Sequence, residues 1–132
     1  AASEGSAPGP RRGRFRHPNL KGITLMQPLA DAMLMGYKKV EGRYHALKLP
    51  KRGGGIWLAL HVGKNLDYFT NYQVMDKVRK LWPGAPTTPS NRRRHGCIVG
   101  LVHVRDCVAS HVCQDPWKEI PRPSNYYYII DK

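Results

Sequence analysis

The sequence predicts an α+β fold that is mostly β: a small barrel of short strands with two to three helices inserted. Three observations favour this class. Short apolar segments alternate with loops rich in Gly and Pro, which is typical of strands in a small β domain. Two other segments carry apolar residues at helical spacing. The 132 residues are enough for one domain with one modest core.

The first strand and the first helix are predicted on either side of Pro28. Residues 23–26 are expected to form a short strand. Pro is tolerated in the first turn of a helix, and residues 29–35 are good helix formers. Gly36 can end this helix in a left-handed cap, so residues 39–44 should leave it as an extended strand.

Residues 56–62 are predicted to form a strand at the centre of the sheet, because the segment is apolar on nearly both faces. We therefore expect Trp57 in the core rather than as a platform that stacks on bases. His61 is expected to be an interior or rim residue. The preceding residues 48–55 are expected to form a basic, Gly-rich loop.

The second half of the chain predicts one helix and two strands. Residues 67–82 have helical spacing and end at a Pro- and Gly-rich break. Strands are expected over residues 97–104 and 126–130, with a bend or bulge at Gly100. The apolar face of the helix is predicted to consist of Phe69, Tyr72, Met75, Val78 and Trp82.

The domain itself is expected to span residues 20–132, after a disordered basic tail over residues 1–19. The first ten residues are mainly Gly, Ser, Ala and Pro, which bury nothing. Four arginines around Phe15 then form an arm suited to lie along nucleic acid. A solubilising tail or part of a targeting segment is the alternative interpretation.

The charge balance favours an anionic partner. The chain has 22 Lys and Arg against 9 Asp and Glu, a formal net charge of +13. Such a field attracts phosphate backbones, so RNA, or another single-stranded or duplex nucleic acid, is the expected partner. A solvated basic surface is the alternative.

Membrane, secretory and metal-binding classes are not favoured. No apolar run approaches the ~20 residues that span a bilayer, and no apolar signal segment begins the chain. We expect a nuclear or cytoplasmic protein, with an organelle also fitting, that is not secreted and has reduced cysteines. Cys107, His111 and Cys113 match no standard zinc spacing, so no metal or other cofactor is expected.

One motif carries a resemblance to a known family. Gly36, Lys38, Glu41 and Arg43 match the pattern G-x-K-x-x-E-x-R of the ASCH family. Residues 25–43 resemble the family's strand, Gln-Pro helix, Gly turn and charged strand, and residues 56–63 and 96–107 resemble later strands. The resemblance covers most of residues 23–131.

The resemblance implies a PUA-like β-barrel that binds RNA or another nucleic acid, closest to the ASCH domain of a transcription coactivator. Some family members are ribonucleases and others are cytidine amidohydrolases. Amidohydrolase activity is not expected here, because Glu41 replaces the family's nucleophilic Thr. The family also continues beyond the strand that residues 126–130 resemble. Two expectations stay open: the chain is a fragment, or the barrel is one strand short, with an open edge that a partner covers or that favours association.

The residues of the motif suit selective recognition of a nucleic acid. Arg43 offers a planar fork to phosphate or guanine, and Lys38 offers a point charge. Glu41 can accept from a base or hold either cation. A salt-bridged strand at the barrel mouth is the structural alternative, and the two can coexist.

Three functions stay open: an RNA-binding module without catalysis, a small ribonuclease in the same cleft, and a protein-interaction module of a coactivator or ribonucleoprotein complex. A ribonuclease would use Lys38, Glu41, Arg43 and His61. The expected nucleic-acid contacts are Lys38, Lys39, Glu41, Arg43, Tyr44, Lys48, Lys51, Arg52, Lys64, Arg92, Arg93, Arg94, Arg11, Arg12, Arg14 and Arg16.

Overall fold

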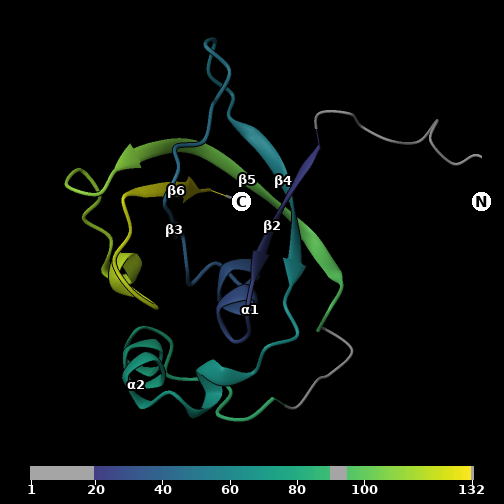
Figure 1. Ribbon diagram of the computed structural model, residues 1–132, viewed down its shortest axis with the longest axis vertical. Coiled ribbons are helices and arrows are strands. Elements are labelled where there is room, and N and C mark those ends of the chain that lie inside the picture. The colour runs from purple at the N-terminus through teal and green to yellow at the C-terminus, as the bar shows by residue number, and fades with distance from the viewer. Residues whose placement is uncertain (1–19, 90–94, 132) are drawn as a thin grey trace, which may run out of the picture.

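The computed structural model describes residues 20–89 and 95–131, in which five strands form one curled sheet (Figure 1). The α+β, mostly β class predicted from the sequence is confirmed. The elements in chain order are β2 (Lys21–Leu25), α1 (Leu29–Leu34), β3 (Val40–Arg43), β4 (Ile56–Val62), the 3-10 helix η2 (Asp67–Thr70), α2 (Tyr72–Leu81), β5 (Ile98–Ala109), the 3-10 helix η4 (Pro116–Glu119) and β6 (Tyr126–Ile130).

The sheet is a half-barrel rather than a closed barrel. Its strand order is β2-β4-β5-β6-β3, with β2 parallel to β4 and every other pair antiparallel. Figure 1 shows the strands curving around α1. Within the described residues, β2 and β3 are therefore the two edges of the sheet, and the open side lies between them.

The core fills the concave side of this sheet. Leu60 and Val62 of β4 and Val102 and Val104 of β5 are buried there. They belong to one apolar cluster with the buried face of α1 and with Val74, Val78 and Trp82 from α2 and the residue after it. Both helices therefore contribute to a single core, as expected for one domain.

Gly36 ends α1 as predicted. Its φ of 86° is the left-handed conformation that favours Gly. The backbone N–H groups of Tyr37 and Lys38 then donate to the carbonyl of Ala32 at 2.9 and 3.0 Å. This cap turns the chain by a fixed amount, so that β3 starts only two residues later.

The second helix differs from the prediction. Residues 67–82 do not form one helix, because Asn71 interrupts it and caps α2 by accepting a hydrogen bond from the N–H of Val74 at 3.2 Å. The buried face of α2 is consequently Val74, Met75 and Val78, while Tyr72 is 81% exposed. None of the helices in the described segments has the length and apolarity to cross a bilayer.

Strands β4 and β5 also correct two expectations. β5 runs for 12 residues, well beyond the predicted end at residue 104, because its second half pairs with β6. The irregularity expected at Gly100 is present: the register with β4 shifts between Leu60 and His61. Trp57 is not in the core, since 46% of it is exposed on the side of β4 opposite Leu58 and Leu60.

Candidate nucleic-acid interface

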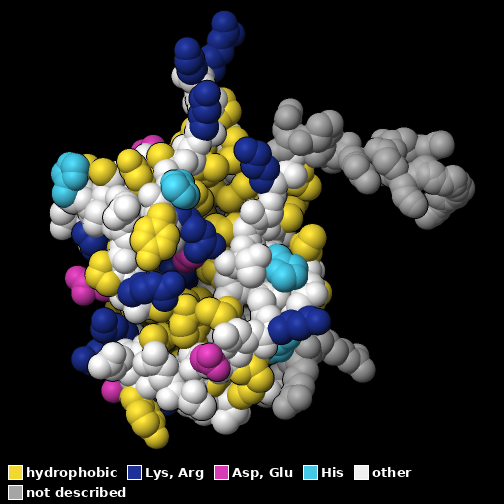
Figure 2. Space-filling model, viewed as in Figure 1, with side chains coloured by type: hydrophobic (Ala, Val, Ile, Leu, Met, Phe, Trp, Pro, Cys, Tyr) yellow, Lys and Arg dark blue, Asp and Glu magenta, His cyan; other side chains and the backbone are white. Residues whose placement is uncertain are grey.

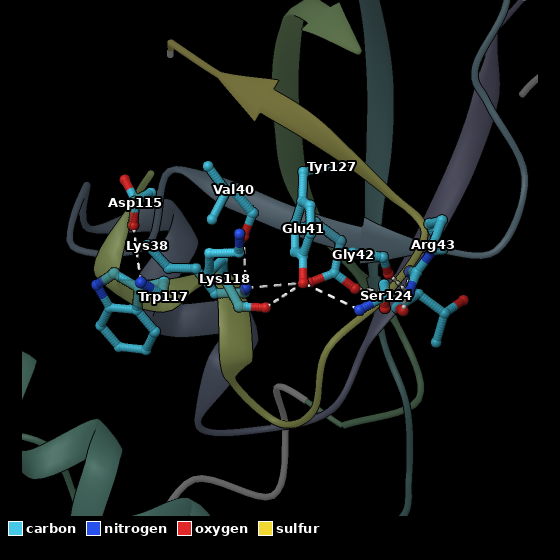
Figure 3. Close-up of polar contacts among 11 residues, drawn as sticks. Lys38, Val40, Glu41, Gly42, Arg43, Asp115, Trp117, Lys118, Ser124 and Tyr127 are labelled. Carbon is cyan, nitrogen blue, oxygen red and sulfur yellow. Dashed lines mark hydrogen bonds and ion pairs between the residues drawn. The ribbon is translucent and has the colours of Figure 1, made fainter. Parts of the chain in front are cut away.

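Lys38 lies inside the molecule instead of in an open cleft. Its side chain is 0% exposed. The ammonium Nζ donates to the carbonyl of Val40 at 2.5 Å and lies 3.1 Å from Glu41 Oε1 and 5.9 Å from the ring centroid of Trp117 (Figure 3). The expectation that Lys38 offers its charge to phosphate is therefore corrected: its charge is already paired and sealed from solvent.

Glu41 is the centre of this ionic cluster and is itself buried. Its Oε2 accepts from Nη1 of Arg43 at 2.5 Å, whereas its Oε1 makes no hydrogen bond and has only the ion pair with Lys38. Each oxygen of the carboxylate therefore lies next to a cation. Glu41 holds Arg43 and Lys38 in place, which is one of the roles expected from the sequence.

Arg43 joins the two edges of the half-barrel. While Nη1 contacts Glu41, Nη2 donates to the backbone carbonyl of Thr24 on β2 at 2.9 Å. A carbonyl that points outward from an edge strand has no partner in the sheet, so this hydrogen bond supplies one across the open side. The Arg43 side chain keeps 34% of its surface exposed and can still present part of its guanidinium to a ligand.

The residue between Glu41 and Arg43 has to be small. A Cβ on Gly42 would lie 2.5 Å from Ser124 Oγ and 3.1 Å from the ring of Tyr127. The Tyr127 hydroxyl accepts from the N–H of Ser124 at 3.0 Å and donates to the carbonyl of Lys118. The loop before β6 is thereby held directly against the motif.

A pocket of about 360 Å³ opens where these segments meet. Arg43, Lys64 and Arg122 contribute three cations to its lining, and Glu41 contributes one carboxylate. Figure 2 shows Lys and Arg side chains on both sides of a hollow near the middle of this face. The remaining lining residues are Thr24, Leu25, Met26, Leu29, Gly42, Tyr44, Gly63, Asn65, Tyr68, Ile120, Pro121 and Ser124.

The structure brings together only some of the predicted contact residues. Glu41, Arg43, Tyr44 and Lys64 line the pocket, whereas Lys39 lies at a different one. Lys48, Lys51 and Arg52 are exposed on a loop that projects from the sheet (Figure 1). The arginines at 11, 12, 14, 16, 92, 93 and 94 lie outside the described residues, so their role stays a prediction.

Three of the four residues named for a ribonuclease lie in one ionic cluster, Lys38, Glu41 and Arg43, whereas His61 lies outside the pocket. Lys38 is buried, and both oxygens of Glu41 face cations. His61 does not line the pocket, and its Nδ1 lies 3.3 Å from Thr24 Oγ1. Among these four residues, the structure does not show a base and an acid that converge on one substrate position, which is the arrangement that such catalysis needs.

Sequence reasoning missed several pocket residues. Arg122 and Ser124 lie in a segment predicted only as a Pro-rich connection, and Asn65 and Tyr68 follow β4. The one local sign of a role for Arg122 is that it is a charged residue between two prolines. Its proximity to Arg43 depends on long-range packing, through Gly42 and Tyr127, which no local pattern encodes.

Tyr128 is the titratable group that responds most clearly to this environment. It is opposite Glu41 on one neighbouring strand and Cys107 on the other. Burial raises the pKa of the Tyr128 phenol above 10.0, the nearby Cys107 raises it further, Arg43 lowers it, and Glu41 raises it. The three cysteines form no disulfide with one another, and the described residues hold no cluster of three or more metal-ligating side chains.

The sequence matches no protein-family model and no curated protein. The ASCH resemblance is therefore still an expectation that depends on the motif and its neighbouring strands.

Proposed function

We propose that this chain is a nucleic-acid-binding module, with RNA as the favoured ligand, and that the pocket between β2, β3 and the 120–124 loop is its contact site. The observation that carries the proposal is the charge of the pocket. Arg43, Lys64 and Arg122 line it, and its one carboxylate is already paired with cations. The surplus positive charge is available to phosphate.

The shape of the pocket supports the same proposal. Its volume of about 360 Å³ lies in the range of ~300–1,000 Å³ that small-ligand sites occupy. Tyr44 is 68% exposed beside Arg43, and Tyr68, which is partly buried, also lines the pocket. Exposed aromatic rings near cations stack on bases while the cations hold the backbone.

The motif has a supporting role in this proposal. Lys38 and Glu41 are satisfied by each other and by Arg43, so they orient the guanidinium rather than supply affinity. Affinity would come from exposed cations around the pocket and on the 48–55 loop. The ASCH resemblance agrees with this assignment and implies a coactivator or ribonucleoprotein context, in the nucleus or cytoplasm.

Salt-dependent binding tests the proposal. Labelled single-stranded RNA, duplex RNA and DNA are titrated at several salt concentrations with the wild type and with Lys64→Gln/Arg122→Gln. Removal of two phosphate contacts should lower the slope of log affinity against log salt by about 1.4 on a single strand, at ~0.7 per contact. Absence of binding to every nucleic acid at low salt would refute the proposal.

The matched control removes the same charge elsewhere. Lys77→Gln/Lys80→Gln changes two exposed lysines of α2 that do not line this pocket. It should leave the salt slope nearly unchanged. Equal losses in the two double variants would mean that net charge, rather than the pocket, determines binding.

A further inference from the structure

The outer face of β4 and β5 carries exposed apolar side chains that the proposed site does not use. Trp57 is opposite His103 and Ala59 is opposite Leu101, on the side of the strands away from Leu58 and Leu60, and Ala59 itself is buried between its larger neighbours. Trp57 and Leu101 are each about half exposed, so this is an apolar surface with an aromatic ring at one end. Such a surface is informative because large apolar groups in contact with water are costly.

Trp57 is held in one orientation by His103. The two ring centroids are 5.0 Å apart and the planes are tilted by 57°. His103 is itself fixed, since Nδ1 lies 2.6 Å from Asp131 Oδ1 and Nε2 lies 2.6 Å from the carbonyl of Gly54. A carbonyl oxygen only accepts, so Nε2 carries the proton in that bond. The indole is therefore supported at one edge while much of it remains open to solvent.

The same histidine fixes the base of the 48–55 loop next to Trp57. A Cβ on Gly55 would lie 2.1 Å from the carbonyl of Val104, so the chain approaches β5 closely just before β4 begins to pair with it. Beyond it the loop projects from the sheet with exposed Lys48, Lys51 and Arg52, and Figure 2 shows Lys and Arg side chains at its tip. The loop that carries these cations is thus anchored, through Gly54 and His103, next to the partly exposed ring of Trp57.

We propose that Trp57 is a stacking platform for an unpaired base, and that the cations of the 48–55 loop hold the adjoining phosphates of a single strand. Aromatic platforms beside a basic track are the features that bind single-stranded nucleic acid without strong sequence preference. Bases in a duplex are already stacked and paired, so they do not offer a face to the indole. The inference rests on the proposed function and deepens it by naming single strands as the ligand class.

The charge of the molecule favours this occupant over a second copy of the chain. Each copy carries a formal net charge of +13, and the loop beside Trp57 adds cations at the edge of the face. Two such faces would repel each other, whereas a polyphosphate chain is attracted to both the loop and the surface around it.

A quenching titration tests the platform directly. Trp82 and Trp117 are buried and Trp57 is the exposed tryptophan, so stacking on Trp57 should quench intrinsic fluorescence. Wild type, Trp57→Leu and Trp57→Tyr are titrated with a 12-nucleotide uridine strand, a 12-nucleotide thymidine strand and a 12-base-pair RNA duplex. We expect Trp57→Leu to weaken single-strand binding roughly five- to hundredfold and abolish quenching, Trp57→Tyr to retain most of the affinity, and neither to alter duplex binding.

The control is another exposed aromatic residue. Tyr72→Leu on α2 should bind the single strands like wild type, and thermal unfolding checks that each variant is folded. If folded Trp57→Leu binds single strands with wild-type affinity, the proposal that Trp57 stacks on a base is overturned. If Lys64→Gln/Arg122→Gln still loses binding in that case, the proposed function is retained. Concentration-dependent dimers that Trp57→Leu abolishes in sedimentation would also overturn the stacking proposal, because the face would then be a contact between copies.

Discussion

Two lysines thirteen positions apart show how differently this fold uses the same residue type. Lys38 belongs to the charged motif and is fully buried against Glu41, Val40 and Trp117. Lys51 belongs to the loop that projects from the sheet and is exposed. The motif is the more specific sequence signal, yet the less conspicuous loop presents the accessible charge.

This difference shows that the charged residues of a motif can stabilise the fold instead of contacting a ligand. A buried ion pair gains little net free energy, but loss of one partner leaves an uncompensated charge in the interior. An exposed lysine costs almost nothing to replace, although its charge acts at long range on a polyanion. Stability experiments and binding experiments should therefore separate the two regions.

The largest expected effect is the difference in stability between Lys38→Met and Lys51→Met. Lys38→Met leaves Glu41 Oε1 without its ion pair, so the free energy of unfolding should fall by about 3–5 kcal/mol in urea denaturation. Lys51→Met should change it by less than about 0.5 kcal/mol, while lowering the salt slope of nucleic-acid binding by about one. Equal losses of stability in the two variants would contradict the conclusion that Lys38 stabilises the fold and Lys51 does not.

An intermediate effect is expected at Arg43, which is partly buried and partly exposed. Arg43→Lys keeps the charge but cannot contact Glu41 and the carbonyl of Thr24 with two separate nitrogens. We expect a loss of roughly 1 kcal/mol, about the net value of one hydrogen bond, as a lower melting temperature. Arg105→Lys, at an exposed position of β5, is the control and should melt like wild type.

The smallest effect concerns the pH dependence near the motif. Because burial raises the pKa of Tyr128 above 10.0, the folded state favours the neutral phenol. Its contribution to stability is complete below pH 10 and is lost as pH rises through the raised pKa. Denaturation between pH 8 and 11 should show a shallower alkaline decline for Tyr128→Phe, whereas Tyr72→Phe should follow the wild-type curve.

The strands and the first helix could be predicted because their signals are local. The apolar runs of β4 and β6, and the Pro28 and Gly36 that bound α1, act within a few residues. The break at Asn71 was missed, because apolar periodicity continues across it and the cap depends on one side-chain hydrogen bond.

The site was less predictable because its residues are set by distant partners. Lys38 is buried by Trp117, which is far away in the sequence, and Arg122 reaches the pocket through the loop held by Tyr127. The apolar sequence of β4 predicts Trp57 in the core, but Trp57 is half exposed on the face opposite Leu58 and Leu60.

The hydrogen bond from Arg43 to Thr24 also has a consequence for the kinetics of folding. It joins the first and last strands in the sheet order, yet its two residues are only 19 positions apart in the sequence. Contacts between residues this close in the sequence cost little loop-closure entropy, so this one does not depend on the earlier pairing of the other strands. Loss of the Arg43 guanidinium should therefore slow the formation of the half-barrel as well as shorten the time for which it stays folded.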